Sequence, residues 1–320
     1  MKVLFICSQN NKNFDISPFI QSQADSIKEK GIKVDVFIVR INKLKGVISN
    51  VKKIRRLKKQ YDILHAHYST NGFLCLLAGA SNKLIVSYLG SDLLGINNSN
   101  GSKNKISIVI QFISYIVSVF SKAIIVKTDQ MKKNISSQYY KKTQIIPNGV
   151  DFDRFYPIAQ NEAKHKLKLD LVKKIVLFLG NPNDSNKNYS LAKLTFGFLP
   201  QTNYLLVSPY PTNPEKIPLF LNAADVLILT SISEGSANVI KEALACNTPI
   251  VTVDVGDASV NVQDVYKAHV VPYDPNKIAG KIIDVCKNSD RSNGRSLINH
   301  LEISIIADRI IAFYRTIFNG

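Results

Sequence analysis

The sequence repeatedly alternates short apolar runs with stretches of helical periodicity, and this alternation limits the folds open to it. The first apolar run, Lys2–Cys7, is followed by a helical stretch that begins at Ser17, with Pro18 at its first position, and ends near Lys30. A second apolar run, Lys33–Val39, comes next. A strand, a helix and a strand joined in this way form a parallel pair with the helix lying across the sheet. We therefore predict an α/β fold built on parallel sheets.

The same pattern continues along the chain and restarts after its midpoint. A Pro-Asn-Gly turn at Pro147–Gly149 and a linker at Asp151–Pro157 separate the two series. The other predicted strands are Asp62–Ala66, Lys83–Tyr88, Ala123–Lys127 and Gln144–Ile146 in the first half, and Ile175–Leu179, Tyr204–Val207, Val226–Leu229, Ile250–Val253 and His269–Val271 in the second. The other predicted helices include Tyr189–Phe198, Lys277–Lys287 and Ile303–Phe318.

A length of 320 residues is comfortable for two domains. We predict two Rossmann-like, doubly wound domains, residues 1–152 and 153–320. In such sheets ligands bind beyond the carboxyl ends of the strands, so the two domains are expected to face each other across a deep cleft. The last helix, residues 303–318, has apolar side chains at helical spacing, and we expect it to pack back toward the N-terminal domain.

The composition limits where in the cell the protein is expected and which kinds of partner it is expected to bind. The apolar start MKVLFIC is too short for a signal peptide, and no apolar run reaches the ~18–20 residues that a membrane span requires. Four scattered cysteines without metal-ligand spacing fit buried thiols in the cytoplasm. The formal charge of +17 indicates an anionic partner, which could be nucleic acid, a membrane or a phosphorylated substrate. Basic patches interleaved with aromatic residues are not evident, so we expect no nucleic acid.

The stretch Ser231–Asp254 has the strongest chemical pattern. Glu234 and Glu242 are eight positions apart, a little over two helical turns. With a helix starting near Ser236, Glu234 lies on the loop before it and Glu242 points from the second turn toward the same crevice. The N–H groups of Ser236, Ala237 and Asn238 then form a phosphate site at the positive end of the helix. A phosphate site beside two carboxylates that can accept hydroxyl hydrogen bonds predicts a pocket for a nucleotide sugar.

Four motifs resemble those of the GT-B glycosyltransferases, and more narrowly the retaining family known as glycosyltransferase family 4. They are DILHAHY at Asp62–Tyr68, the triplet Gly90-Ser91-Asp92, IPNGVDFDRFYP at Ile146–Pro157, and AADVLILTSISEGSANVIKEALACNTPIV from Ala223. Each motif alone is weak, but their order and spacing together are specific. The resemblance implies a GT-B fold and sugar transfer from a nucleoside-diphosphate sugar carrying UDP, GDP or ADP. It also implies retention of anomeric configuration, no cofactor and no metal.

The resemblance also implies roles for individual residues. Glu234 is expected to contact the hydroxyls of the transferred sugar, Glu242 the ribose, and Lys187 the diphosphate. His67 and Asp92 are expected to complete the catalytic group. The remaining expected donor contacts are Gly180, Asn181, Gly235, Ser236, Ala237 and Asn238, and the expected acceptor contacts are Asn13, Gly90 and Ser91.

Purely structural roles stay open as alternatives for several of these residues. Lys187 could be a solvated surface lysine, Asp92 a turn or capping residue, and His67 a strand-end histidine of the core. We expect His65 to lie on the face opposite to His67.

Three departures from the family pattern keep other functions open. Asn181 stands where the family usually has an arginine, Leu89 where many members have a histidine, and Gln9–Asn13 lacks the usual glycine pair. The favoured function is a transferase that builds surface polysaccharide, lipopolysaccharide or capsule on a glycan or lipid-linked acceptor. The alternatives are a nucleotide-sugar-binding protein without turnover and, with less support, a GT-B nucleotide-sugar epimerase.

Two helical stretches bear on membrane contact. Within Lys43–Lys59, apolar residues from Leu44 to Leu57 fall on one helical face and cations crowd the rest. This pattern predicts either docking on an anionic membrane, which would make the protein peripheral on the cytoplasmic side, or a core helix with a solvated basic face. The stretch Ile106–Phe120 is almost wholly apolar. We expect it to be a buried or partly buried helix, with contact to a lipid-linked acceptor as an alternative.

Overall fold

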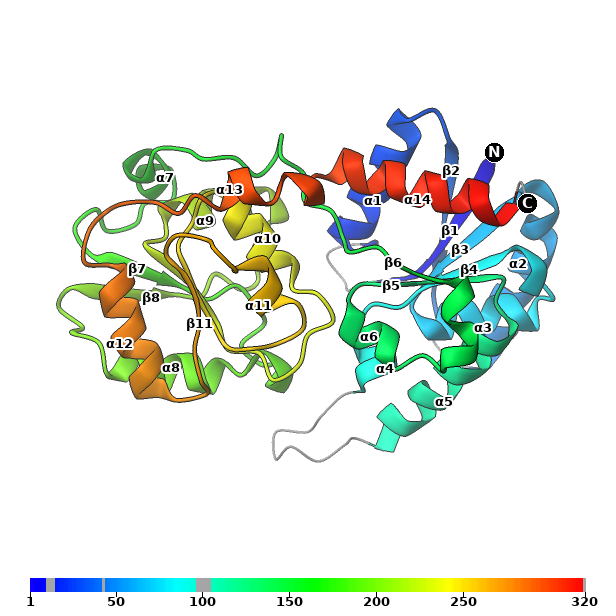
Figure 1. Ribbon diagram of the computed structural model, residues 1–320, viewed down its shortest axis with the longest axis horizontal. Coiled ribbons are helices and arrows are strands. Elements are labelled where there is room, and N and C mark those ends of the chain that lie inside the picture. The colour runs from blue at the N-terminus through cyan, green and yellow to red at the C-terminus, as the bar shows by residue number, and fades with distance from the viewer. Residues whose placement is uncertain (10–14, 42–43, 96–104, 319–320) are drawn as a thin grey trace. The chain divides into compact units, whose positions relative to one another are not determined.

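The computed structural model describes residues 1–9, 15–41, 44–95 and 105–318, and the chain divides into two compact α/β units (Figure 1). Among the described residues, the first unit comprises residues up to Gly149 together with those from Ile303 onward, and the second comprises Val150–Glu302. The break therefore falls at Gly149–Val150, and the C-terminal helix belongs to the first unit.

A parallel six-stranded sheet forms the centre of the first unit, with the order β2-β1-β3-β4-β5-β6. Its strands are β1 (Lys2–Ser8), β2 (Lys33–Val39), β3 (Ile63–His67), β4 (Leu84–Ser87), β5 (Ala123–Val126) and β6 (Thr143–Ile145). Residues Val3–Cys7 of β1 are buried, as expected for a central strand that is covered on both faces.

The helices of the first unit lie on both faces of this sheet. They are α1 (Pro18–Glu29), α2 (Leu44–Leu57), α3 (Ser69–Leu77), α4 (Ser91–Leu94), α5 (Lys105–Phe120), α6 (Asp129–Lys133) and α14 (Ile303–Phe318), with 3-10 turns η1 (Lys58–Gln60), η2 (Ser81–Lys83) and η3 (Ser137–Lys142). Helices α1 and α14 pack together along one face, and α3 packs against both α2 and α5 on the other (Figure 1).

A parallel five-stranded sheet forms the centre of the second unit, with the order β11-β10-β9-β7-β8. Its strands are β7 (Lys174–Leu177), β8 (Tyr204–Val207), β9 (Val226–Leu229), β10 (Ile250–Thr252) and β11 (Ala268–Val270). Its helices are α7 (Gln160–Lys166), α8 (Tyr189–Gly197), α9 (Ile217–Ala223), α10 (Asn238–Ala245), α11 (Ala258–Asn261), α12 (Pro275–Val285) and α13 (Gly294–Leu297), with 3-10 turns η4 (Ser185–Lys187), η5 (Pro214–Lys216) and η6 (Asn299–Leu301). The predicted fold class of two doubly wound parallel sheets is confirmed.

Helix α14 is held to the first unit by both apolar and polar contacts. Ile306, Ile310 and Tyr314 are buried along its inner face, and the Tyr314 hydroxyl lies 2.5 Å from Nδ1 of His65 on β3. Gly149 permits the chain to pass close to this helix, because a Cβ there would lie only 2.8 Å from the Cα of Ile303. The predicted packing of the last helix on the N-terminal half is therefore confirmed.

The four cysteines are free and buried. None of the helices in the described ranges combines the length and the hydrophobicity needed to cross a bilayer.

Candidate active site

Two loops of the second unit meet at the carboxyl ends of the neighbouring strands β7 and β9. The chain leaves β7 toward β8 on one side, while β9 lies on the other side of β7, which makes this the topological switch point of the sheet. The Asn186 side chain donates to the Ser233 carbonyl at 2.8 Å, and the Ile232 N–H donates to the Asn186 carbonyl at 2.8 Å. These bonds join the β7–α8 loop to the β9–α10 loop.

The joined loops bring Lys187 and Glu234 into contact. The Lys187 ammonium lies 2.5 Å from Oε1 of Glu234, with 29% and 15% of the two side chains exposed. Gly180, just after β7, lies against the Lys187 stem, since a Cβ on Gly180 would be 3.3 Å from Cγ of Lys187. Three residues predicted as donor contacts are therefore brought together, with a cation and a carboxylate that solvent can reach.

Helix α10 begins two residues later than the sequence predicted. Its first residue is Asn238, with Ala237 at the N-cap position, so Ser236 precedes the helix. The Ser236 hydroxyl donates to Oδ2 of Asp257 at 2.7 Å and accepts from the Lys241 ammonium at 2.5 Å. These side-chain bonds hold Ser236 in the loop, and the positive end of the helix dipole lies at residues 237–238.

Lys241 and Asp257 were not predicted from the sequence as residues of this site. Lys241 is buried within α10, and its ammonium lies 3.7 Å from Oδ2 of Asp257. Burial lowers the pKa of Lys241, and the nearby Asp257 opposes that shift. The available signal was a lysine between the apolar residues Ile240 and Leu244 of this helix, because a buried ammonium requires an anionic partner.

Gly256, on the loop after β10, lies close to the backbone of the Glu234 loop. Its φ of +58° is in the left-handed region, and a Cβ would lie 2.9 Å from the carbonyl oxygen of Glu234 and 3.1 Å from that of Gly235. Only glycine fits this combination of backbone conformation and close approach. The backbone of the Glu234-Gly235 turn is therefore positioned by direct contact with a neighbouring loop.

Glu242 lies on α10 next to Lys241 and is partly buried. Burial raises its pKa to about 7, while the charges of Arg154 and Lys241 act in the opposite direction. The side chain can therefore exchange a proton near neutral pH, and in its ionised form it can accept hydrogen bonds from hydroxyl groups.

Asn181 organises the turn that leads to Lys187. Its Oδ1 accepts from the Asn183 N–H at 3.0 Å, and its carbonyl accepts from the Asp184 N–H at 3.0 Å. The asparagine thus supplies loop geometry at a position where the resemblance led us to expect a cation.

In the first unit, His67 lies at the carboxyl end of β3 and is buried. Its ring stacks on His65 with centroids 4.4 Å apart and contacts Phe5 at 4.7 Å. Neither ring nitrogen has a hydrogen-bond partner among the described residues. Burial, and to a smaller extent the charge of Lys127, lowers the pKa of His67 to about 3, so the ring is neutral. This placement in the core agrees with the alternative that His67 is a strand-end histidine of the core.

His65 does not lie on the opposite face, as the sequence interpretation expected. Residues two apart on a strand share a face, and the two rings stack. Both ring nitrogens of His65 have partners, the Tyr314 hydroxyl at 2.5 Å and the Ser87 hydroxyl at 2.7 Å.

Asp92 is buried and ties together the loops that follow β3 and β4. Its carboxylate accepts from the N–H groups of Ser69 at 3.2 Å, Leu89 at 3.0 Å and Gly90 at 2.9 Å. Burial raises the pKa of Asp92 to about 6, although the backbone donors favour the ionised form. Gly90 has a φ of 137°, which suits glycine, and the Ser91 hydroxyl lies 3.1 Å from that of Tyr68. The carboxylate therefore shapes the loop that carries Gly90 and Ser91, two of the three predicted acceptor contacts.

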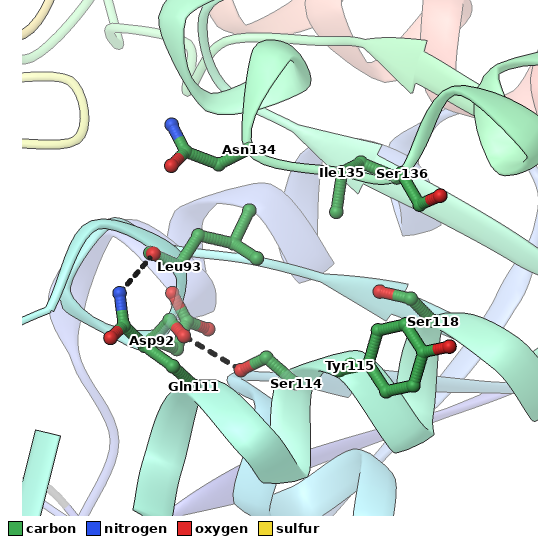
Figure 2. A pocket seen from close by; sticks show the side chains of 9 residues that line it. All are labelled: Asp92, Leu93, Gln111, Ser114, Tyr115, Ser118, Asn134, Ile135 and Ser136. Atoms are coloured by element: carbon green, nitrogen blue, oxygen red, sulfur yellow. Dashed lines mark hydrogen bonds between the residues drawn. The ribbon is translucent and has the colours of Figure 1, made fainter. Parts of the chain in front are cut away.

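A pocket of about 150 Å³ lies beside Asp92 within the first unit (Figure 2). Hydroxyl and amide side chains line much of it, and its lining residues are Asp92, Leu93, Gln111, Ser114, Tyr115, Ser118, Asn134, Ile135 and Ser136. The Gln111 amide donates to the Leu93 carbonyl at 2.8 Å, and the Ser114 hydroxyl donates to the Asp92 carbonyl at 2.6 Å (Figure 2).

The predicted acceptor contact Asn13 lies outside the described residues. Within the described ranges, no three His, Cys, Asp or Glu side chains gather in a way that could hold a metal ion.

Two family models match the chain and together cover most of it. Residues 7–154 match the model described as Glycosyltransferase Family 4, and residues 162–296 match that described as Glycosyl transferases group 1. By these matches the chain belongs to the group 1 glycosyltransferases. The second model includes Lys187, Glu234 and Glu242, and the first includes His67 and Asp92. The predicted site residues of each unit thus fall within a region that matches a glycosyltransferase model.

Curated relatives of this glycosyltransferase are distant. The chain is 24% identical over 284 residues to the D-inositol 3-phosphate glycosyltransferase of Mycolicibacterium vanbaalenii, a match that covers 75% of this chain and 63% of the relative. It is also 24% identical over 247 residues to an uncharacterised glycosyltransferase of Methanocaldococcus jannaschii, covering 72% and 66% of the two chains. The matched region therefore spans about two thirds of each relative's length.

Solved structures share the fold of this glycosyltransferase over its full length. Sucrose-phosphate synthase from Thermosynechococcus elongatus aligns with a TM-score of 0.79 at 17% identity and covers 100% of both chains. HepE from Anabaena, in complex with UDP and glucose, aligns with a TM-score of 0.74 at 14% identity and covers 99% of this chain and 100% of that chain. At these identities the likeness establishes the fold alone.

Proposed function

We propose that this glycosyltransferase transfers a sugar from a nucleoside-diphosphate sugar to a glycan or lipid-linked acceptor, with retention of anomeric configuration and without a metal ion. The observation that carries the proposal is the Lys187–Glu234 pair at the switch point of the second unit. An ammonium beside a carboxylate, next to the N-terminus of α10, suits a ligand that presents a diphosphate and a sugar side by side.

Each side chain has a role that follows from its chemistry. Lys187 offsets the charge of the diphosphate as the bond from the anomeric carbon to the phosphate oxygen breaks. Glu234 accepts hydrogen bonds from the hydroxyls of the transferred sugar, and Glu242 accepts them from the ribose. The acceptor oxygen forms the new bond to the anomeric carbon on the face that the diphosphate leaves, and its proton passes to the departing phosphate. Most of the rate acceleration then comes from positioning and charge stabilisation.

The proposal also includes the place where the acceptor binds and the cellular location of the protein. We assign the acceptor to the first unit, with Gly90, Ser91 and Asn13 as contacts. The pathway would be the synthesis of surface polysaccharide, lipopolysaccharide or capsule on the cytoplasmic side of the membrane. Asp92 supports the acceptor loop through its backbone hydrogen bonds.

Peripheral attachment to an anionic membrane through α2 also belongs to this proposal. Lys45, Lys52, Lys53, Arg55, Arg56 and Lys59 are all exposed on or beside this helix. Each cation near an anionic surface contributes on the order of 1 kcal/mol. Ile48 is exposed on the predicted apolar face, while Ile54 is fully buried, so only part of that face packs on the unit. Flotation with anionic vesicles should weaken when Lys52, Lys53, Arg55 and Arg56 are changed to Glu.

The function can be tested by donor turnover. Purified protein is incubated with UDP-, GDP- and ADP-sugars and lipid-linked acceptors in EDTA, and the product's anomeric configuration is read by NMR. Retained configuration is expected, with turnover lost in Glu234→Ala. Full activity of Glu234→Ala would remove the proposed site. Nucleotide binding without turnover on any acceptor would favour the binding protein, and a changed sugar nucleotide without acceptor would favour the epimerase.

A further inference from the structure

Helix α5 of the first unit has its polarity reversed relative to a helix on the surface of a water-soluble domain. Its inward face carries three serines, Ser107, Ser114 and Ser118, together with Val117. Its outward face carries large apolar side chains that are 52–64% exposed: Ile106, Ile108, Val109, Phe112, Tyr115 and Phe120, which we call the α5 stripe. At 100° per residue these two sets lie on opposite sides of the helix. A helix in water normally turns its apolar face inward.

The inward serines make specific contacts, so this orientation is built into the fold. The Ser114 hydroxyl donates to the Asp92 carbonyl at 2.6 Å, and the Ser118 hydroxyl lies 2.7 Å from that of Tyr88. On the α3 side the approach is close, because a Cβ on Gly72 would lie 2.8 Å from Cγ1 of Val117. Rotating α5 to hide the stripe would break these hydrogen bonds and this packing.

The charges around the stripe indicate what covers it. Lys105 begins the helix, Lys122 follows it, and the Lys142 ammonium donates to the carbonyls of Val119 and Ser121 at the end of the helix. The sequence contains no Asp or Glu between Asp92 and Asp129. Helix α3 packs against both α5 and the basic helix α2, so the stripe and those cations belong to one helical layer.

We propose that the α5 stripe inserts into an anionic lipid bilayer while the cations of α2 contact the lipid headgroups. An apolar helix face flanked by cations is the pattern of a helix that lies in the membrane interface. A second copy of this chain would bring its own cations against these ones, since the formal charge of each copy is +17. This inference rests on the membrane attachment proposed above and adds a hydrocarbon contact that α2 alone would not make.

A fluorescence experiment tests insertion directly, because the chain contains no tryptophan. Phe112→Trp places a single reporter in the stripe, and Phe198→Trp places one at a comparably exposed site (52%) directly after α8 of the second unit. Each protein is mixed with vesicles of phosphatidylcholine containing about one third phosphatidylglycerol. Phe112→Trp emission should shift to the blue and be quenched by lipids brominated in the acyl chain, while Phe198→Trp emission should stay unchanged.

Binding variants complete the test. The double variant Phe112→Ser/Phe120→Ser should bind these vesicles about ten-fold more weakly. The matched control Leu194→Ser/Phe198→Ser, which changes one residue on α8 and the residue directly after it, should bind like the parent. Phe112→Trp emission that does not change on vesicles which carry the protein in flotation would overturn insertion, because charge alone would then hold the protein. A dimer in buffer that Phe112→Ser abolishes would also overturn it and would make a second copy the occupant.

These measurements need neither donor nor turnover, so their result is independent of whether the proposed sugar transfer is correct.

Discussion

At the scale of single residues, the Lys187–Glu234 pair has to open for a donor to bind as proposed. The diphosphate competes with Glu234 for the same ammonium, which lies 2.5 Å from Oε1. A partly exposed ion pair of this kind is worth up to about 1 kcal/mol. The pair therefore keeps Lys187 positioned without holding it so tightly that a phosphate could not replace the carboxylate.

Glu234→Gln separates the two proposed roles of this carboxylate. The variant should bind a bare nucleoside diphosphate about three- to five-fold more tightly than the parent, because the ammonium no longer has to leave an anion. It should at the same time lose most turnover, because the contact to the sugar is weakened. Calorimetry with UDP, GDP and ADP measures the first effect. Weaker binding of every nucleoside diphosphate by the variant would contradict this account of the pair.

Glu242 predicts a pH dependence of folding stability. Its pKa is raised to about 7 in the folded chain, so the folded state holds this proton more tightly than the unfolded state. The stability that this bound proton contributes is fully present below the pKa that Glu242 has in the unfolded state. It is lost as the pH rises through about 7. Between about pH 5 and about pH 8 the parent should lose about 1–2 kcal/mol relative to Glu242→Gln, measured by urea unfolding. Parallel stability curves for the two proteins would show that Glu242 does not titrate in this way.

Residue identities were easier to predict than side-chain surroundings. Glu234, Glu242 and Lys187 were predicted as site residues from spacing and motif, and these roles stay predictions, although the contact between Lys187 and Glu234 brings two of them together. Lys241 and Asp257 were missed because their contact joins α10 to a loop that follows another strand, and one sequence does not display such a contact. The placement of His65 was misjudged by applying the two-residue strand period in the wrong sense.

At the scale of elements, the Glu234 loop is shaped by neighbours rather than by its own helix. Ser236 donates a hydrogen bond to Asp257 instead of starting α10, and Gly256 lies close to the loop backbone at Glu234 and Gly235. The predicted helix start was therefore two residues too early, because local capping patterns do not include tertiary bonds of this kind.

Gly256→Ala should disturb this loop directly. The added Cβ is both strained at a φ of +58° and within 2.9 Å of the Glu234 carbonyl. We expect a loss of about 1–3 kcal/mol in unfolding free energy and weaker nucleotide binding. Gly280→Ala in α12 is the matched control, because its Cβ would have nothing within 4 Å and should stabilise the helix slightly. Equal nucleotide affinity in parent and Gly256→Ala would show that the loop does not depend on this contact.

The strands were predicted well for a related physical reason. The central strands β5 and β9 are buried, continuous apolar runs that were visible in the sequence, whereas the edge strands β2, β6 and β11 are only partly buried. Helix α5 was harder, because a nearly all-apolar stretch does not show which face lies outward.

At the scale of the whole molecule, the chain leaves the first unit at Gly149 and returns to it at Ile303. Helix α14 therefore completes the first unit although it comes last in the sequence. The amphipathic pattern of this helix predicted only that it is packed, whereas its partner His65 could be identified only from the structure.

Tyr314→Ala should destabilise the first unit selectively. Tyr314 is fully buried, and its removal leaves a cavity and an unpaired His65 nitrogen, at a cost of about 3–5 kcal/mol. Hydrogen exchange should rise in peptides of the first unit and stay unchanged in Val150–Glu302. Ile305→Ala, on the same helix and 42% exposed, serves as the control and should change little. A uniform rise across both units would mean that they unfold together.

The most direct test of the central claim is thermal unfolding in EDTA with a panel of UDP, GDP and ADP. At least one nucleotide, at about 100 times its dissociation constant, should raise the melting temperature of the parent by about 5 °C or more. Lys193→Met, which removes an exposed cation from α8, should respond equally, whereas Lys187→Met should respond little or not at all. No response to any nucleotide, or an undiminished response in Lys187→Met, would contradict a donor site at Lys187 and Glu234.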